Sequence, residues 1–144
     1  MEVHQPLTLV RLVVFASAAL FGSSPIRDID YSFSIQSISR VFSRALAMGE
    51  LGPDKFCERV GSEPTGRAFN SVPAVADMPA HTGNPHVNAG AIANVSLISG
   101  KTADEKWNKI LNFYSRVAGK KITLIDERYE SEAATNTGNK ALSV

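Results

Sequence analysis

Apolar residues recur at helical spacing in residues 34–46. The stripe that they form consists of Ile35, Ile38, Phe42 and Leu46. Ser37, Arg40 and Arg44 lie three and four positions apart, so they share a second face of the predicted helix. Ser34 is the predicted N-cap, which places Ser37 in the first turn. Backbone N–H groups in a first turn are unpaired and can hold an oxyanion, so a serine there is a candidate nucleophile.

A second amphipathic helix is predicted between Thr102 and Gly119. Thr102 and Glu105 match a capping box at its start, and Gly119 is a natural C-terminal stop. Its predicted core stripe consists of Trp107, Ile110, Leu111, Tyr114 and Val117. Because acidic residues interleave with the lysines of this region, we interpret the lysines as a solvated face rather than a nucleic-acid patch.

Glycine and proline residues separate the shorter predicted helices. Gly49 is expected to end the first helix and Pro53 to open the next. Phe56 and Val60 give that helix an apolar edge. Cys57, the single cysteine, is expected to be buried as a small hydrophobe.

Residues 62–85 are rich in proline and glycine and are predicted to form a long surface loop. His81 and His86 are expected to be exposed, since two histidines supply too few ligands for a metal site. Asn88 begins a predicted apolar helix, and the residues alone favour an N-cap role for it. The small residues 89–91 would let this helix approach a neighbour or a ligand closely.

Residues 7–21 are apolar with one charge, too short and too interrupted for a membrane span. We interpret them as a buried β-strand followed by a turn at residues 22–25. A secretory signal is the alternative, because residues 16–18 read Ala-Ser-Ala, but Glu2 and the lack of lysine upstream argue against it. We therefore expect a cytoplasmic protein.

Composition narrows the function classes. The 144 residues are about one domain's worth of sequence, and 44% hydrophobic with 20% charged residues is typical of a globular protein. With a net charge of +1, the chain lacks the excess of positive charge that is typical of nucleic-acid-binding proteins. A single cysteine excludes an internal disulfide. We expect no cofactor, no metal, no nucleic acid and no membrane as partner.

The run Phe-Ser-Ile-Gln-Ser-Ile-Ser at residues 33–39 resembles the serine-dependent glutaminases, in which a Ser-x-x-Lys pair lies on this helix. The resemblance implies that Ser37 attacks the side-chain amide of L-glutamine and that the residue at position 40 takes its proton. Serine needs such a base because its hydroxyl is a weak nucleophile. Arg40 holds that position, and a guanidinium stays protonated, so it is not competent as a base.

Three further runs resemble the same family, in order along the chain. They are Glu-Pro-Thr-Gly-Arg-Ala-Phe-Asn-Ser at 63–71, Asn-Pro-His-Val-Asn-Ala-Gly-Ala-Ile at 84–92, and residues 126–142, which are similar to Tyr-x-Ser-Glu-x-x-Thr-x-x-x-Asn-x-Ala-Leu. The resemblance implies that the substrate is bound by Ser37, Asn88, Glu132 and Asn139. The chemistry agrees, because a carboxylate suits the α-ammonium group of glutamine and asparagine donors suit its α-carboxylate.

The resemblance also implies the fold class, mixed α/β and similar to β-lactamases and penicillin-binding proteins. We expect a mainly helical part of that fold, with an N-terminal strand and with much of the sheet missing. Residues 1–27 match the family poorly. Residues 28–144 are expected to be a partial glutaminase domain that is truncated at its C-terminal side.

Three functional hypotheses follow. The first is a glutaminase that converts L-glutamine to L-glutamate and ammonia through a serine acyl-enzyme, with its activity in doubt because of Arg40. The second is a non-catalytic remnant that binds glutamine or pairs with a complete family member, and a homo-oligomer is compatible with both. The third is a truncated product that does not fold stably, which a non-cooperative thermal transition would reveal.

Overall fold

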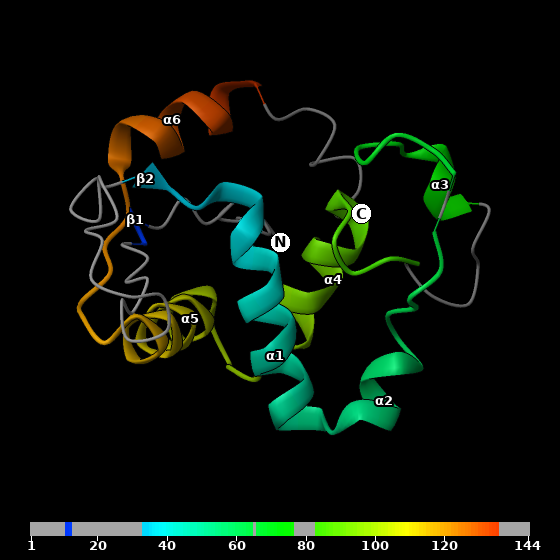
Figure 1. Cartoon of the computed structure of the whole chain (residues 1–144), viewed down its shortest axis with the longest axis horizontal. Helices are drawn as coiled ribbons and strands as arrows, with labels where there is room; N and C mark the ends of the chain where they lie inside the picture. Colours follow the sequence, from blue (N-terminus) through cyan, green and yellow to red (C-terminus); the bar gives the residue numbers. More distant parts are fainter. Residues whose placement is uncertain (1–10, 13–32, 65, 77–82, 136–144) are drawn as a thin grey trace, which may run out of the picture.

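The computed structural model of the chain describes residues 11–12, 33–64, 66–76 and 83–135 and is mainly helical in these ranges (Figure 1). A two-residue antiparallel pair joins β1 to β2, with Arg11 opposite Ser34 and Leu12 opposite Phe33. The elements are β1 (Arg11–Leu12), β2 (Phe33–Ser34), the 3₁₀ helix η2 (Gln36–Ile38), α1 (Ser39–Leu51), α2 (Pro53–Cys57), α3 (Pro73–Ala76), α4 (Asn88–Leu97), α5 (Ala103–Ala118) and α6 (Asp126–Thr135). Most of the strand predicted at 7–21 lies outside the described residues.

Helix α1 is the centre of the described fold, because it packs against α4, α2 and α5 (Figure 1). The hydrophobic cluster around it consists of Ile35, Ala47, Phe56, Val60, Ile98, Ile110, Tyr114 and Ile122, with Phe42 and Leu46 packed against it and partly buried. None of the helices in the described ranges is long and apolar enough to cross a bilayer.

The apolar stripe predicted for the first helix is wrong at Ile38, whose side chain is 54% exposed. Residues 36–38 form a 3₁₀ helix with three residues per turn, which rotates Ile38 away from the face expected of a continuous α-helix. The buried positions of α1 are instead Ser39, Ser43 and Ala47, spaced four apart. Small side chains on this face allow neighbouring helices to approach it closely.

Two other expectations for this part of the chain are wrong. Helix α1 does not end at Gly49 but continues to Leu51, because Gly52 supplies the positive φ, 83°, of the C-cap. Cys57 is exposed rather than buried, since Phe56 occupies the inward position of α2 and the next residue faces solvent. The predictions that Pro53 opens α2 and that Phe56 and Val60 are buried are confirmed.

The sequence signals at both ends of α5 are confirmed. The Thr102 hydroxyl accepts the N–H of Glu105 at 3.1 Å, and Gly119 adopts the left-handed conformation of a C-cap. The Glu105 carboxylate accepts the N–H of Lys101, at 2.7 Å, one residue before the N-cap. Val117, expected in the core, is 51% exposed. The buried residues of α5 are Ile110 and Tyr114, and Val117, seven residues after Ile110, lies on nearly the same face, so helical spacing does not explain its exposure.

Tyr114 links α5 to the first turn of α1, because its hydroxyl donates to the carbonyl of Ser39 at 2.9 Å. Burial raises the pKa of Tyr114 to about 12, although hydrogen bonds with Ser43 and Ser39 act in the opposite direction. The native chain therefore holds this proton between about pH 10, where tyrosine in an unfolded chain ionises, and pH 12. Stability is fully present below this window and is lost as the pH rises through it.

We expect the free energy of unfolding to fall by about 2 to 3 kcal/mol between pH 10 and pH 12 through Tyr114. Urea unfolding across this window, with Tyr114→Phe as the control, measures the difference. The variant lacks the hydroxyl, so it should lose about 1 kcal/mol at neutral pH and show a shallower alkaline decline. Equal alkaline losses in both chains would contradict the role of Tyr114.

Candidate active site

Ser37 lies exposed in η2, two residues before α1 begins. The expected N-cap role of Ser34 is wrong, since Ser34 ends β2 and no side chain caps η2 or α1. The residue before Ser37, Gln36, has a φ of 35°, an uncommon conformation for a residue with a side chain. Such strained positions cluster at functional sites, where a sharp turn presents a side chain. The expectation of unpaired N–H groups beside Ser37 is wrong for Ile38 and Ser39, because the N–H of Ile38 donates to the Ile35 carbonyl at 2.8 Å and that of Ser39 donates to the Gln36 carbonyl.

Arg40 joins the two sequence runs that carry the candidate site. Its guanidinium donates one hydrogen bond to the main-chain carbonyl of His86 and another, of 2.5 Å, to Oδ1 of Asn88. The side chain therefore crosses from α1 to the start of α4. Burial lowers the pKa of Arg40, but an arginine remains charged at neutral pH.

Asn88 is the first residue of α4 and is 7% exposed. The N-cap role favoured by its sequence context is wrong, because Val87 is the N-cap and no side chain caps the helix. Its main-chain N–H instead donates to the carbonyl of Phe69 at 2.8 Å, and its side chain accepts from Arg40. Since Arg40 occupies Oδ1, the NH₂ group of the amide is directed away from the guanidinium.

The turn before α4 is fixed by close packing against the helix. A β-carbon at Gly90 would lie 2.1 Å from the carbonyl oxygen of Asn84 and 2.7 Å from Cα of Pro85, so only glycine fits. The buried side chain of Asn94 donates to the Pro85 carbonyl at 3.1 Å. The expectation that small residues allow a close approach is thus confirmed at Gly90. This packing holds the His86 carbonyl where Arg40 reaches it.

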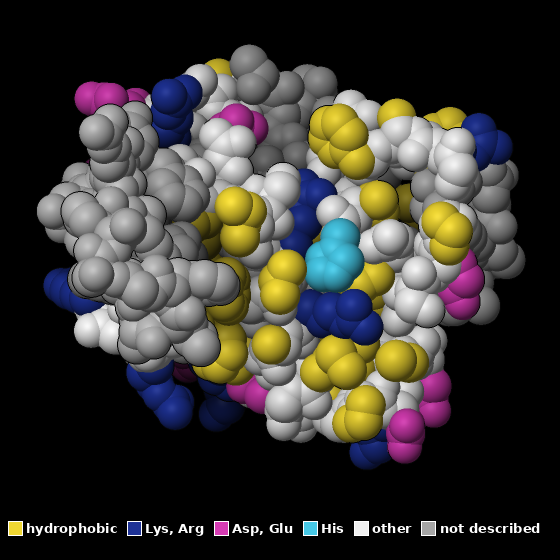
Figure 2. Space-filling view, in the orientation of Figure 1, with side chains coloured by type: hydrophobic (Ala, Val, Ile, Leu, Met, Phe, Trp, Pro, Cys, Tyr) yellow, Lys and Arg dark blue, Asp and Glu magenta, His cyan; other side chains and the backbone are white. Residues whose placement is uncertain are grey.

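Positive charge gathers beside these residues. Burial lowers the pKa of His86, and the charges of Arg44 and Arg40 lower it further. Figure 2 shows a histidine between Lys or Arg side chains at the middle of this face, with hydrophobic side chains around them and acidic ones farther out. His86 is exposed, as predicted, while His81 lies outside the described residues.

Comparison with known proteins decides the family. The model of the glutaminase family matches residues 23–144. The chain belongs to the glutaminase family. It is 47% identical to the glutaminase of Brucella canis and 45% identical to that of Colwellia psychrerythraea, each over 116 residues, 81% of this chain and 37% of the relative. The crystal structure of a probable glutaminase of Bacillus subtilis superposes with a TM-score of 0.74 at 36% identity, over 78% of this chain and 36% of that one.

These values also define how much of a glutaminase the chain spans. It covers 37% of the length of the curated relatives. The match begins at residue 23 and includes the four runs from which the glutaminase resemblance was inferred. Both Ser37 and Asn88 lie inside the matched region and inside the described residues.

For the other two residues expected in a glutaminase site, the structure gives less information. Glu132 lies exposed on α6, a helix that sequence spacing did not predict. Asn139 lies outside the described residues. The structure therefore joins Arg40 and Asn88 by a hydrogen bond, and the roles of all five site residues remain predictions. Sequence reasoning missed Arg44 and the His86 carbonyl, although the spacing of Arg40 and Arg44 had placed both on one face.

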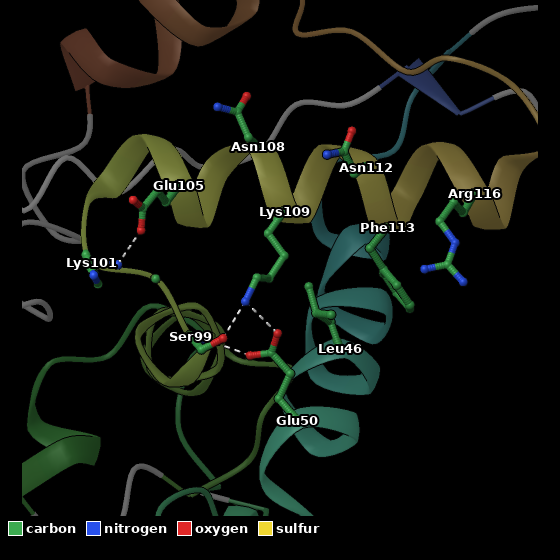
Figure 3. Close-up of a pocket in the computed structure, with 11 residues that line it drawn as sticks. Leu46, Glu50, Ser99, Lys101, Glu105, Asn108, Lys109, Asn112, Phe113 and Arg116 are labelled. Carbon is green, nitrogen blue, oxygen red and sulfur yellow. Dashed lines mark hydrogen bonds and ion pairs between the residues drawn. The ribbon is translucent and has the colours of Figure 1, made fainter.

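A separate open hollow of about 970 Å³ lies between the end of α1, the loop after α4, and α5 (Figure 3). Its lining does not include Ser37 or Asn88. Lys109 donates to Glu50 at 2.8 Å and to the Ser99 hydroxyl, while the Ser99 N–H donates to Glu50 at 2.7 Å. Lys109 lowers the pKa of Glu50 against the raising effect of its burial. These groups satisfy one another, so we interpret the hollow as a structural junction.

The chain offers no metal centre in the ranges that the structure describes, since no three His, Cys, Asp or Glu side chains gather there. The polar groups that the structure describes here are the Ser37 hydroxyl, the Asn88 amide, two guanidinium groups and the imidazole of His86. The guanidinium groups can orient and stabilise anions, but the one at position 40, where the family has its base, is unable to take the serine proton at neutral pH.

Proposed function

We propose that this chain binds L-glutamine at a site formed by Ser37 and Asn88 and hydrolyses it far more slowly than its longer relatives. The observation that carries this proposal is the 2.5 Å hydrogen bond from Arg40 to Asn88. It links the helix that follows Ser37 with the residue that, by family resemblance, holds the amino-acid head of the substrate. Residues 48 positions apart in sequence are thus brought to one place.

In the proposed reaction the Ser37 Oγ attacks the Cδ carbonyl of glutamine. The oxyanion that forms requires hydrogen-bond donors, the Cδ–N bond then breaks, and ammonia leaves with the serine proton. Water then hydrolyses the glutamyl ester to L-glutamate. The slow step is the removal of the serine proton. Arg40 occupies the position of the family's base lysine, and a guanidinium stays charged at neutral pH.

We expect ammonia release from L-glutamine to be about 10² to 10⁴ times slower than that of the Brucella canis glutaminase, because general-base catalysis typically contributes this factor. The measurement is a coupled ammonia assay on both proteins and on Ser37→Ala. The residual activity should disappear in Ser37→Ala while the melting temperature is retained, since this side chain is exposed. Turnover that equals the relative, or that survives Ser37→Ala, would contradict the proposal.

A further inference from the structure

The turn before α4 folds back along the helix and meets it at two positions that are four residues apart. At Gly90 the turn comes so close that a β-carbon would collide with the backbone of Asn84 and Pro85. One helical turn later, the side chain of Asn94 donates to the Pro85 carbonyl at 3.1 Å. Gly90 provides space without a direction, whereas a hydrogen bond has a preferred distance and angle. The amide of Asn94 therefore determines where the Pro85 carbonyl points.

Stability alone does not explain an amide at position 94. The side chain of Asn94 is 0% exposed, and its Oδ1 has no hydrogen-bond partner among the residues that the structure describes. A buried polar atom without a partner costs free energy. A leucine of similar size would leave the Pro85 carbonyl unpaired instead, so the amide leaves as many buried groups unpaired as an apolar residue would. What the amide adds is the direction of the turn.

Both groups that Arg40 contacts lie on this turn or directly after it. The carbonyl of His86, which follows that of Pro85 in the chain, accepts a hydrogen bond from Arg40. Oδ1 of Asn88 accepts the second, of 2.5 Å. A local hydrogen bond stiffens the turn, because the N–H of His86 donates to Oδ1 of Asn84 at 2.8 Å. A displacement of the Pro85 carbonyl is therefore transmitted to His86 and Asn88.

We propose that Asn94 is a positioning residue for the candidate active site, because its amide holds the turn where Arg40 meets the His86 carbonyl and the Asn88 side chain. The inference rests on the proposed function, since it takes L-glutamine as the ligand of Asn88. Asn94 acts through the turn and does not itself contact the ligand, because its side chain is fully buried.

The test is isothermal titration calorimetry with L-glutamine on the unaltered chain, Asn94→Leu and Asn94→Ala. Both variants remove the donor to the Pro85 carbonyl; leucine keeps the volume of the side chain, and alanine avoids overpacking if leucine prevents folding. We expect each variant to bind about tenfold more weakly, the effect of one misplaced hydrogen bond. Ile110→Val is the matched control. It removes a buried methyl group from α5, so the melting temperature should fall while the affinity stays unchanged.

A second measurement needs no ligand. Burial lowers the pKa of His86, and the charges of Arg44 and Arg40 on α1 lower it further. When the turn moves away from Arg40, this charge acts less strongly on the imidazole. NMR titration of His86 should therefore give a higher pKa in Asn94→Leu and Asn94→Ala than in the unaltered chain, and Ile110→Val should leave the titration unchanged.

The two measurements separate failure of the inference from failure of the proposed function. Equal affinities of the unaltered chain and both Asn94 variants would overturn the inference and leave the proposed function in place. Weakening of the same size by Ile110→Val would show a general effect of stability and would also overturn the inference. If the unaltered chain does not bind L-glutamine, the proposed function fails, and an unchanged titration of His86 in the Asn94 variants then overturns the inference as well.

Discussion

Replacing Gly90 by alanine is expected to destabilise the chain by about 3 kcal/mol, the upper end of the cost of overpacking. The added β-carbon would meet the Asn84 carbonyl oxygen at 2.1 Å and the Pro85 backbone at 2.7 Å. Backbone atoms cannot rotate away as a flexible side chain does, so the turn or α4 must shift. Thermal unfolding should show a fall in melting temperature on the order of 10 °C.

Gly49→Ala is the matched control, because it adds the same atom inside α1 where no other group lies within 4 Å. Alanine loses less conformational freedom than glycine in a helix, so this variant should gain about 0.5 to 1 kcal/mol. Equal melting temperatures of Gly90→Ala and the unaltered chain would contradict the packing described for the turn. The same shift should also weaken ligand binding, since the turn positions both acceptors of Arg40.

Arg40→Lys is expected to raise ammonia release from L-glutamine by about a hundredfold, the lower end of the contribution of a general base. A lysine amine loses its proton when burial lowers its pKa, and the same burial already lowers the pKa of Arg40. The new amine can also keep a hydrogen bond to the Asn88 amide oxygen. The proton of Ser37 then has an acceptor three residues away along the chain.

The control for this gain is Arg40→Gln, which removes the guanidinium but supplies no base. It should release ammonia no faster than the unaltered chain, and the rate of Arg40→Lys should rise with pH as the amine loses its proton. A gain of equal size in Arg40→Gln would mean that the guanidinium merely obstructs the site. That result would contradict the assignment of position 40 to the base.

Local signals in the sequence were sufficient for much of the helical structure. The hydroxyl of Thr102 and the left-handed Gly119 mark the ends of α5, because both act within one turn of the chain. Pro53 opens α2 for the same local reason. Each of these residues determines its own backbone conformation, so its effect needs no knowledge of tertiary contacts.

Positions that depend on tertiary packing could not be predicted in this way. Ser39 and Ser43 are buried although they are polar, because α1 presents a small-residue face to its neighbours. Ile38 and Val117 are more than half exposed although they are apolar. The 3₁₀ turn of residues 36–38 shifts the helical register at α1, and no residue preference in the sequence announces it.

The candidate site, too, was predictable from the sequence only in part. Ser37 and Asn88 were singled out because their runs resemble a family, and both lie within the region that the family matches. The bond between Arg40 and Asn88 was not predicted, since it depends on a turn held by Gly90 and Asn94. Sequence spacing therefore indicated which residues to examine, and the packing of α4 against α1 determined how they meet.

The account depends on Ser37 and position 40 acting as one unit, and the most direct measurement is ammonia release by the double variant Ser37→Ala/Arg40→Lys. We expect the activity gained by Arg40→Lys to vanish in the double variant, because an amine without a nucleophile cannot form the glutamyl ester. The melting temperature should stay that of Arg40→Lys. Ammonia release that persists at the level of the single variant would contradict the account.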